Sequence, residues 1–209
     1  MTESAEKNFP AYSHLPLALQ LKPNGIGVKH YTMSGCMTPK IVDDKYDRSV
    51  CNDWQMYSVD KIANDPDIKY VIVSYRVETF LFEPGYKEGF KLLINRLLNS
   101  DKKIILVMQA PKIDHYINYY IRYSLAGMDV KSVKLADWKI LNKDEYSFIK
   151  DLPKKVTVID PADAFCDTTS CYAIRNNTSL YFDDNHMSVA GASMVAEIID
   201  PLIVKSIMN

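Results

Sequence analysis

The chain has 209 residues with 25 basic and 26 acidic side chains, which gives a formal net charge of −1. This balance leaves no basic surface for nucleic acid or anionic lipid, and no apolar run approaches the ~20 residues that a membrane-spanning helix needs. Hydrophobic residues make up 47% of the chain, which excludes a disordered protein. We predict a polar segment at residues 1–10, which is not a signal peptide, and one domain over residues 11–209.

Four short apolar runs predict strands, and they lie at residues 26–31, 70–75, 104–108 and 156–159. Continuous β-branched runs are typical of strands buried on both faces, as in a parallel sheet. Helical periodicity covers residues 86–99 and 114–126, and a last helix begins near Ser188, a suitable N-cap, and is interrupted by Pro201. The alternation predicts an α/β fold: a three-layer αβα sandwich of flavodoxin-like type with a mainly parallel sheet.

The helix predicted at residues 114–126 carries four tyrosines at helical spacing: Tyr116, Tyr119, Tyr120 and Tyr123. Packing is the preferred interpretation of this stripe, and stacking on sugar rings is the alternative. His115 at its start is expected to be solvated. His30 alternates with apolar residues and is interpreted as a hydrogen-bonded core or rim residue.

The four cysteines form two sequence pairs, Cys36 with Cys51 and Cys166 with Cys171. The even number of cysteines and the close spacing within each pair favour disulfides and an oxidising compartment. A zinc site is the competing interpretation, and it fits poorly because the sequence has no CxxC motif. Free buried thiols remain the other alternative. The acidic cluster near the first two cysteines, Asp43, Asp44, Asp47 and Asp53, matches no calcium-loop spacing, and we expect no metal and no cofactor.

An acid and a histidine three residues apart, Asp183 and His186, precede the small residues that open the last helix. At this spacing the carboxylate reaches the Nδ1 proton of the ring and fixes its tautomer, so that Nε2 accepts a proton from a hydroxyl. That arrangement is the base half of a serine hydrolase or acyltransferase. The alternative is a plain turn in which Asp183 accepts local backbone N–H groups.

Binding sites of open α/β sheets lie beyond the carboxyl ends of the strands. This rule selects Gly35, residues 74–76, residues 109–112 and residues 160–163 as rim positions. The Asp183–His186 turn is expected to follow the last strand at the same edge.

Several segments, taken in order, resemble blocks of the SGNH hydrolase superfamily. The closest resemblance is to the SGNH domain attached to membrane O-acyltransferases of bacterial surface polysaccharides. The matching segments are Ser13-His14, Ser34–Pro39, Val71–Arg76, Val158–Pro161 and Leu180–Ala192. The resemblance covers about residues 11–200, and its closing block is the specific part.

The resemblance implies a Ser13 nucleophile, His186 as its general base and Asp183 as the residue that orients His186. Backbone N–H groups of Ser13 and Gly35 would hold the oxyanion, with Arg76 supplying positive charge. His14, beside Ser13, is a candidate for lining the site. The resemblance also implies an acyl donor, a glycan acceptor and no nucleic-acid partner. It further implies a periplasmic or other extracytoplasmic location, and a membrane acyltransferase domain in the full-length protein.

The chain departs from the superfamily pattern at its start. Ala11 and Tyr12 replace the Gly and Asp before the serine, and residues 1–10 are too polar for a central strand, so the first strand is expected to be degenerate or missing. Ser13 as a helix N-cap is the alternative to Ser13 as nucleophile, and Ser34 is the reserve nucleophile. The expected function is O-acetyl transfer to a polysaccharide. The alternatives are a carbohydrate esterase and a catalytically inactive glycan- or partner-binding domain.

Overall fold

The computed structural model describes residues 9–33, 36, 38–42, 45–46, 49–75, 83–125 and 127–207, without the side chains of residues 9–13 and 46. These residues form two compact units. Unit 1 comprises residues 1–32, 110–141 and 160–209, and unit 2 comprises residues 33–109 and 142–159. The single domain predicted over residues 11–209 stays a prediction. No described helix is both long and apolar enough to cross a membrane.

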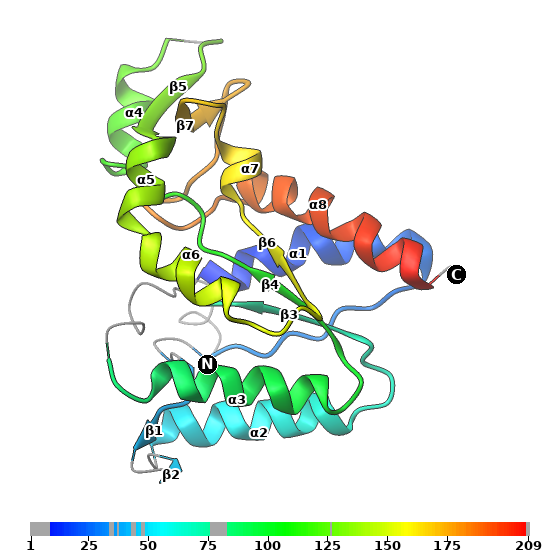
Figure 1. Ribbon diagram of the computed structural model, residues 1–209. Helices are drawn as coiled ribbons and strands as arrows, with labels where there is room; N and C mark the ends of the chain where they lie inside the picture. The colour runs from blue at the N-terminus through cyan, green and yellow to red at the C-terminus, as the bar shows by residue number, and fades with distance from the viewer. Residues whose placement is uncertain are drawn as a thin grey trace. The chain divides into compact units, whose positions relative to one another are not determined.

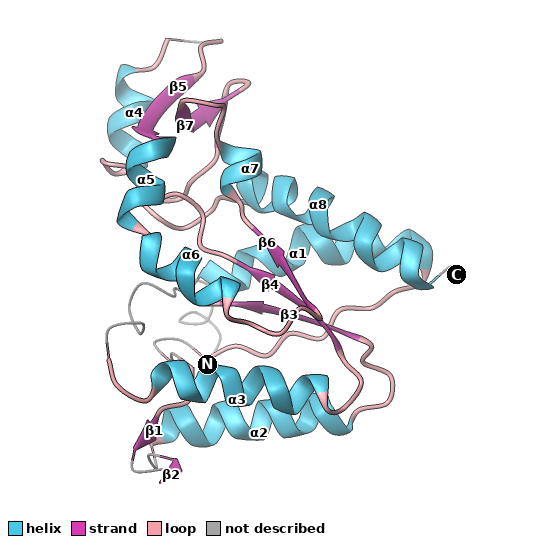
Figure 2. Ribbon diagram, viewed as in Figure 1, coloured by secondary structure: helices cyan, strands magenta, loops and turns pink. Residues whose placement is uncertain are grey.

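Unit 2 holds a three-stranded parallel sheet in the order β3-β4-β6 (Figure 2). Its strands are β3 (Tyr70–Ser74), β4 (Lys103–Val107) and β6 (Val156–Ile159). The register pairs Ser74 with Val107 and Val107 with Ile159, so these strands end at a common edge. The three β-branched runs therefore form the parallel sheet that the sequence predicts, and the α/β class is confirmed.

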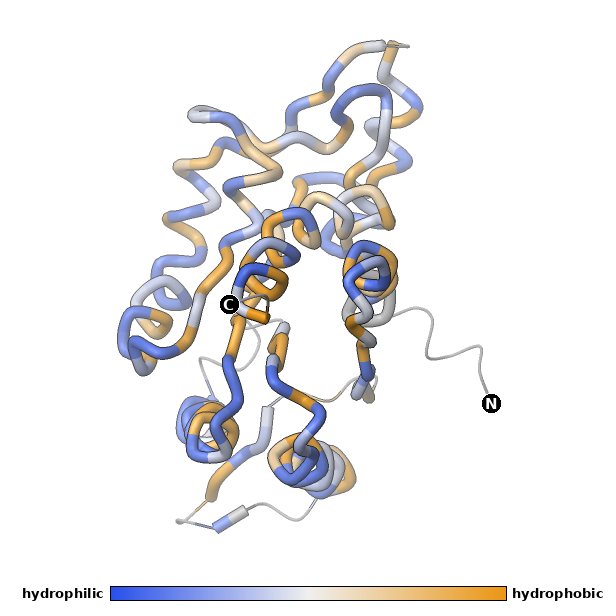
Figure 3. Tube along the Cα trace, turned by 90° about the vertical axis from the view of Figure 1, so that its right-hand side faces the viewer, coloured by the Kyte–Doolittle hydropathy of each residue, from blue (hydrophilic) through white to orange (hydrophobic). Residues whose placement is uncertain are grey.

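Three helices of unit 2 pack on this sheet: α2 (Val50–Asn64), α3 (Tyr86–Leu98) and α6 (Lys143–Lys150). Phe90 of α3 is fully buried and meets Phe148 of α6 edge to face, with ring centroids 5.6 Å apart. Figure 3 shows hydrophobic and hydrophilic residues alternating around the helical turns, as expected for helices with one buried side. A short hairpin, β1 (Ile41–Val42) with β2 (Lys45–Tyr46), completes the unit.

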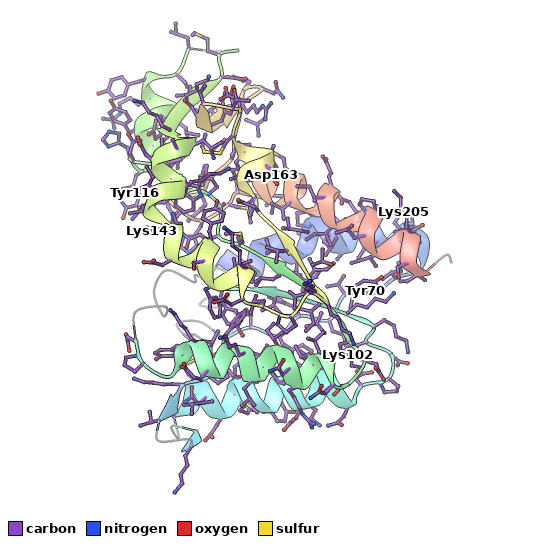
Figure 4. The ribbon with its side chains drawn as sticks, viewed as in Figure 1. Tyr70, Lys102, Tyr116, Lys143, Asp163 and Lys205 are labelled. Carbon is purple, nitrogen blue, oxygen red and sulfur yellow. A yellow bond between two sulfur atoms is a disulfide. The ribbon has the colours of Figure 1, made fainter. Side chains whose placement is uncertain are left out.

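Close backbone approaches hold the segment before β1 against α3. A Cβ on Gly89 would lie 1.7 Å from the Pro39 carbonyl oxygen, so only glycine fits there. At the other end of the sheet, the buried Lys102, labelled in Figure 4, donates from Nζ to the Asp65 and Ile68 carbonyls at 2.7 and 2.9 Å. These bonds fasten the chain between α2 and β3 to the start of β4.

Unit 1 contains a second sheet, antiparallel, in the order β5-β7-β8. The strands are β5 (Val130–Lys134), β7 (Ser170–Arg175) and β8 (Thr178–Ser179). The helices of the unit are α1 (Phe9–Leu21), η1 (Lys22–Asn24), α4 (Ile117–Tyr123), α5 (Leu135–Leu141), α7 (Ala162–Phe165) and α8 (Val189–Ile207). Helices α1 and α8 lie side by side (Figure 1), with Leu17, Leu21, Val195 and Ile199 buried.

Two expectations for unit 1 are wrong. Residues 26–31 form no strand, because most of them are exposed and they pair with none of the described strands. Pro201 does not interrupt the last helix, because α8 continues to Ile207. A proline removes one helical hydrogen bond, and the buried side chains of Ile199 and Ile203 on either side keep the helix packed.

Candidate functional site

The Asp183–His186 segment forms a tight turn in unit 1. The Phe182 N–H donates to the His186 carbonyl at 2.8 Å, and Tyr181 and Met187 face each other in an antiparallel bridge. Both residues of the bridge are buried, so the turn stands on an apolar base. The chain turns here because apolar residues flank a polar run that begins with Asp183, Asp184 and Asn185, residue types that favour turns.

The two carboxylate oxygens of Asp183 have different partners. Oδ1 accepts the backbone N–H groups of Asn185 and His186 at 2.9 and 2.8 Å. Oδ2 lies 2.5 Å from Nδ1 of the His186 ring. The sequence left a plain turn and a carboxylate–imidazole pair as alternatives, and the structure contains both in one side chain.

The hydrogen bonds set the charge of this carboxylate. Burial by itself would raise the pKa of Asp183, but the N–H groups of Asn185 and His186 and the His186 ring outweigh it and lower the pKa. An ionised Asp183 accepts the proton on Nδ1, so the neutral imidazole carries its lone pair on Nε2. The side chains of Asp183 and His186 are 24% and 30% exposed, so the pair is reachable from solvent.

Helix α8, which follows the Asp183–His186 turn in the chain, supports the turn. The Gly191 N–H donates to Ser188 Oγ at 3.1 Å, and Ser188 Oγ donates to the Ser179 carbonyl at 2.7 Å. Ser188 is therefore the N-cap that the sequence predicts. A Cβ on Gly191 would lie 2.3 Å from the Leu180 carbonyl oxygen, so the glycine lets α8 approach the chain that leads into the turn.

The segment leading into α4 supports the turn from the other side. The Ile113 and Ile117 N–H groups donate to the Asp184 and Asp183 carbonyls at 2.9 and 3.1 Å. The buried Tyr181 hydroxyl donates to the Pro111 carbonyl at 2.5 Å, and burial raises the pKa of Tyr181. The catalytic candidates thus lie on a turn whose backbone is bonded to a second segment of the same unit.

The predicted nucleophile, oxyanion donors and site-lining residues lie partly outside the described residues. Ser13 lies within helix α1, which begins at Phe9, so its backbone is neither at a strand end nor at a helix N-cap; its side chain is outside the described part of the chain. The His14 ring stacks on His30 at a centroid distance of 4.0 Å. His30 is exposed rather than in the core. Ser34, Gly35 and Arg76 are outside the described residues.

Both predicted disulfides are present: Cys36–Cys51 and Cys166–Cys171. The zinc and free-thiol alternatives are thereby excluded for these four residues, because neither pair is left with a thiol. Disulfides persist in oxidising compartments outside the cytoplasm. The described residues contain no group of three or more His, Cys, Asp or Glu side chains that could hold a metal ion. Of the acidic cluster, Asp43, Asp44 and Asp47 are outside the described residues.

Rim positions at the sheet edge have local roles. Asp160 follows β6 and accepts the Ala162 N–H at 2.9 Å, and Tyr75 follows β3 and donates from its hydroxyl to Gln55 Oε1 at 2.8 Å. The Asp183–His186 turn does not directly follow the parallel strands, because the β7–β8 hairpin precedes it.

The β7–β8 hairpin is absent from the elements predicted above, although its turn carries a sequence signal. Asn176 and Asn177 both have positive φ, 50° and 58°, which is the pair of conformations that a type I′ hairpin turn requires. An Asn-Asn pair between two short runs of β-forming residues predicts such a hairpin. Strand β8 has only two residues. The neighbouring strand β5 carries lysines and pairs with register shifts, so its sequence does not show the two-residue alternation of a strand.

One tyrosine of the predicted stripe is buried and three are exposed to solvent. Tyr120 is buried, whereas Tyr116, Tyr119 and Tyr123 are exposed. Packing, the preferred interpretation of the stripe, therefore holds for Tyr120 alone. His115 is exposed, as predicted.

Comparison with known proteins gives a consistent family. The model for "SGNH domain (fused to AT3 domains)" matches residues 14–201. The periplasmic domain of a lipopolysaccharide acetyltransferase from Salmonella ser. Paratyphi A is similar in structure, with a TM-score of 0.67 and 15% identity over 94% of this chain and 80% of that one. No curated protein matches the chain. The family match covers nearly the whole sequence, so the chain belongs to the SGNH domains that are fused to AT3 domains, a family of acyl-transferring and hydrolysing proteins.

Proposed function

We propose that the chain transfers an O-acetyl group to a bacterial surface polysaccharide through a serine ester. The observation that carries the proposal is the Asp183–His186 pair, in which one carboxylate oxygen holds the ring and the other holds the turn. Such a pair activates a hydroxyl nucleophile as a general base. The similar lipopolysaccharide acetyltransferase domain supports acetyl as the group and a polysaccharide as the acceptor.

In the first half of the reaction, His186 Nε2 takes the Ser13 hydroxyl proton while Ser13 Oγ attacks the acetyl carbonyl of the donor. The Ser13 N–H lies in the second turn of helix α1, where it faces the carbonyl four residues earlier, so it is not available to the oxyanion. In this mechanism the tetrahedral oxyanion is held by the Gly35 N–H and by the positive charge of Arg76. A donor of this kind stabilises the transition state by about 3 kcal/mol. The donor's leaving group departs with the proton from His186, which leaves acetyl-Ser13.

In the second half, His186 takes the proton of a sugar hydroxyl, and the sugar oxygen attacks acetyl-Ser13. Collapse of the intermediate returns the proton to Ser13 and releases the acetylated glycan. If water replaces the sugar, the same groups produce free acetate, which is the esterase alternative. The acyl donor is expected to come from the membrane acyltransferase domain to which this family is fused, on the extracytoplasmic side of the membrane.

The test measures acetylated glycan and free acetate side by side, with an acetyl donor and a polysaccharide acceptor. Wild type is expected to acetylate the glycan, and His186→Ala is expected to lose this activity by orders of magnitude while it keeps its fold. Free acetate without acetylated glycan supports the esterase. An active His186→Ala protein contradicts the proposed base.

A second candidate is a catalytically inactive domain that binds glycan or a partner. The position of Ser13 within helix α1 favours this candidate, because nucleophilic serines of α/β enzymes sit at strand ends. The two functions differ in reactivity toward a serine-directed fluorophosphonate. Labelling that is lost in Ser13→Ala supports the enzyme, and no labelling of either protein supports the binding domain.

A further inference from the structure

We propose that three exposed tyrosines, Tyr116 at the N-cap of α4 and Tyr119 and Tyr123 within it, bind the sugar rings of the polysaccharide acceptor; we call them the tyrosine face. The role of these sugars as acceptor rests on the proposed function. These three residues are 68%, 48% and 68% exposed. Figure 4 labels Tyr116 at the start of α4.

Helix geometry gathers these rings on one side. Successive residues turn by about 100°, so positions 116, 119 and 123 fall within about 60° of one another. Ile121, which is also exposed, lies on the opposite side of the helix by the same count. The face spans about 10 Å along α4, a length that two linked pyranose rings cover.

The rings support one another. Tyr119 is central: its centroid lies 4.3 Å from that of His115, 4.9 Å from that of Tyr123, and 5.5 Å from that of Tyr120. A ring held by three others loses little conformational entropy when it binds a ligand.

Side-chain hydrogen bonds of the buried Tyr120 fix the helix beneath the face. The Tyr120 hydroxyl lies 2.7 Å from Ser132 Oγ, and Ser132 Oγ donates to Asp114 Oδ1 at 2.8 Å. Because the Ser132 proton goes to Asp114, the Tyr120 hydroxyl is the donor of the first bond. These bonds join α4 to β5 and keep Tyr119 in place through its contact with Tyr120.

The start of α4, where the tyrosine face begins, is hydrogen-bonded to the candidate catalytic turn. The Ile117 N–H, in the first turn of α4, donates to the carbonyl of Asp183 itself at 3.1 Å. The exposed Phe182 stands next to Asp183 in sequence, so aromatic side chains occur on both segments joined by this bond. A sugar chain lying along α4 from Tyr123 to Tyr116 therefore runs toward the residues that would deprotonate its hydroxyl.

The chemistry of the face favours a saccharide over other occupants. A pyranose presents an apolar C–H side and a rim of hydroxyls, and tyrosine presents an apolar ring with a polar hydroxyl. The segment from Asp114 to Tyr123 contains one acidic and one basic side chain, Asp114 and Arg122, so it offers no excess positive charge to an anionic lipid surface.

The experiment measures binding of soluble polysaccharide, released from lipopolysaccharide by mild acid, to the 209-residue chain by titration calorimetry. We expect saturable binding that falls about tenfold or more in Tyr119→Leu and in Tyr123→Leu. Tyr119→Phe keeps the ring and is expected to bind nearly as wild type does. Tyr57→Leu is the matched control, because Tyr57 is an equally exposed tyrosine on α2 of unit 2.

Three outcomes overturn the proposal: no binding by wild type, equal binding by wild type and the leucine variants, or an equal loss in Tyr57→Leu. Sedimentation tests whether a second copy of the chain binds the tyrosine face, and phosphatidylglycerol vesicles test whether an anionic lipid surface does. Self-association or vesicle binding that requires Tyr119 also overturns the proposal. Fluorophosphonate labelling is measured separately. Sugar binding through the tyrosine face in a protein that no probe labels supports this inference and contradicts the catalytic proposal.

Discussion

At the scale of single residues, Asp183 uses one oxygen for the backbone and the other for the ring, and these two uses can be separated. Asp183→Asn keeps an acceptor for the N–H groups but presents an amide N–H₂ to Nδ1. The ring must then accept on Nδ1 and carry its proton on Nε2, where it cannot act as a base. We expect turnover of an acetyl ester to fall on the order of 10⁴-fold.

The control is the neighbouring Asp184→Asn, which removes an ion pair with Lys112 at 3.3 Å and leaves Asp183 in place. Turnover by this variant is expected to stay within a few-fold of wild type, because exposed ion pairs contribute ~0–1 kcal/mol. Equal turnover in Asp183→Asn and wild type would contradict the role of Asp183.

Sequence spacing was sufficient to predict that Asp183 and His186 meet, because three residues of turn leave few alternatives. It was not sufficient for Ser13, whose position depends on packing between segments far apart in the chain. Its neighbours Ala11 and Tyr12 also depart from the superfamily pattern. Local chemistry is readable from sequence, whereas the partner of a catalytic base is set by tertiary structure.

At the scale of elements, the start of α8 depends on Gly191. Gly191→Ala would place a Cβ 2.3 Å from the Leu180 carbonyl oxygen and 2.8 Å from the Phe165 ring. We expect the free energy of unfolding to fall by about 1–3 kcal/mol, although alanine favours helix. Gly27→Ala is the control, because a Cβ there meets nothing within 4 Å. Urea unfolding measures both, and a Gly191→Ala protein as stable as wild type would contradict this packing.

The β5–β7 pair carries a pH-dependent contact at Asp167. Lys131 Nζ of β5 and the Tyr172 hydroxyl of β7 each lie 2.7 Å from Asp167 Oδ2. The bond from Lys131, followed by the Thr169 N–H, the Tyr172 hydroxyl and the Ser170 N–H, holds the pKa of Asp167 well below its ordinary value.

A carboxylate with a lowered folded-state pKa stabilises the fold above its unfolded pKa of about 4, and this contribution is lost as the pH falls further. We therefore expect Asp167→Asn to lower the melting temperature at neutral pH and to lower it less at about pH 3. A difference between the two proteins that is the same at both pH values would contradict the assignment.

The elements that sequence predicted well are those whose pattern is strong by itself. Strands β3, β4 and β6 are runs of β-branched residues, and α3 has a regular apolar stripe. The segment at residues 26–31 alternates apolar with polar residues but pairs with none of the described strands, so it stays irregular. Strand formation depends on a partner, which no local pattern contains.

At the scale of the whole molecule, one disulfide lies in each unit. Loops of 15 and 5 residues are closed by Cys36–Cys51 and Cys166–Cys171. Replacing both cysteines of a pair with alanine is expected to lower the free energy of unfolding by ~3 kcal/mol for the first and ~2 kcal/mol for the second. Urea unfolding of each double variant measures this, and a reductant should destabilise wild type but not the chain lacking all four cysteines. Unchanged midpoints would contradict the prediction.

The proposed acyl transfer requires a serine that is activated by His186. The most direct measurement is fluorophosphonate labelling of the intact chain, followed by mass spectrometry of the labelled peptide. We expect a single adduct on Ser13 that is absent from His186→Ala. An adduct on another serine, or no adduct on wild type, would contradict it.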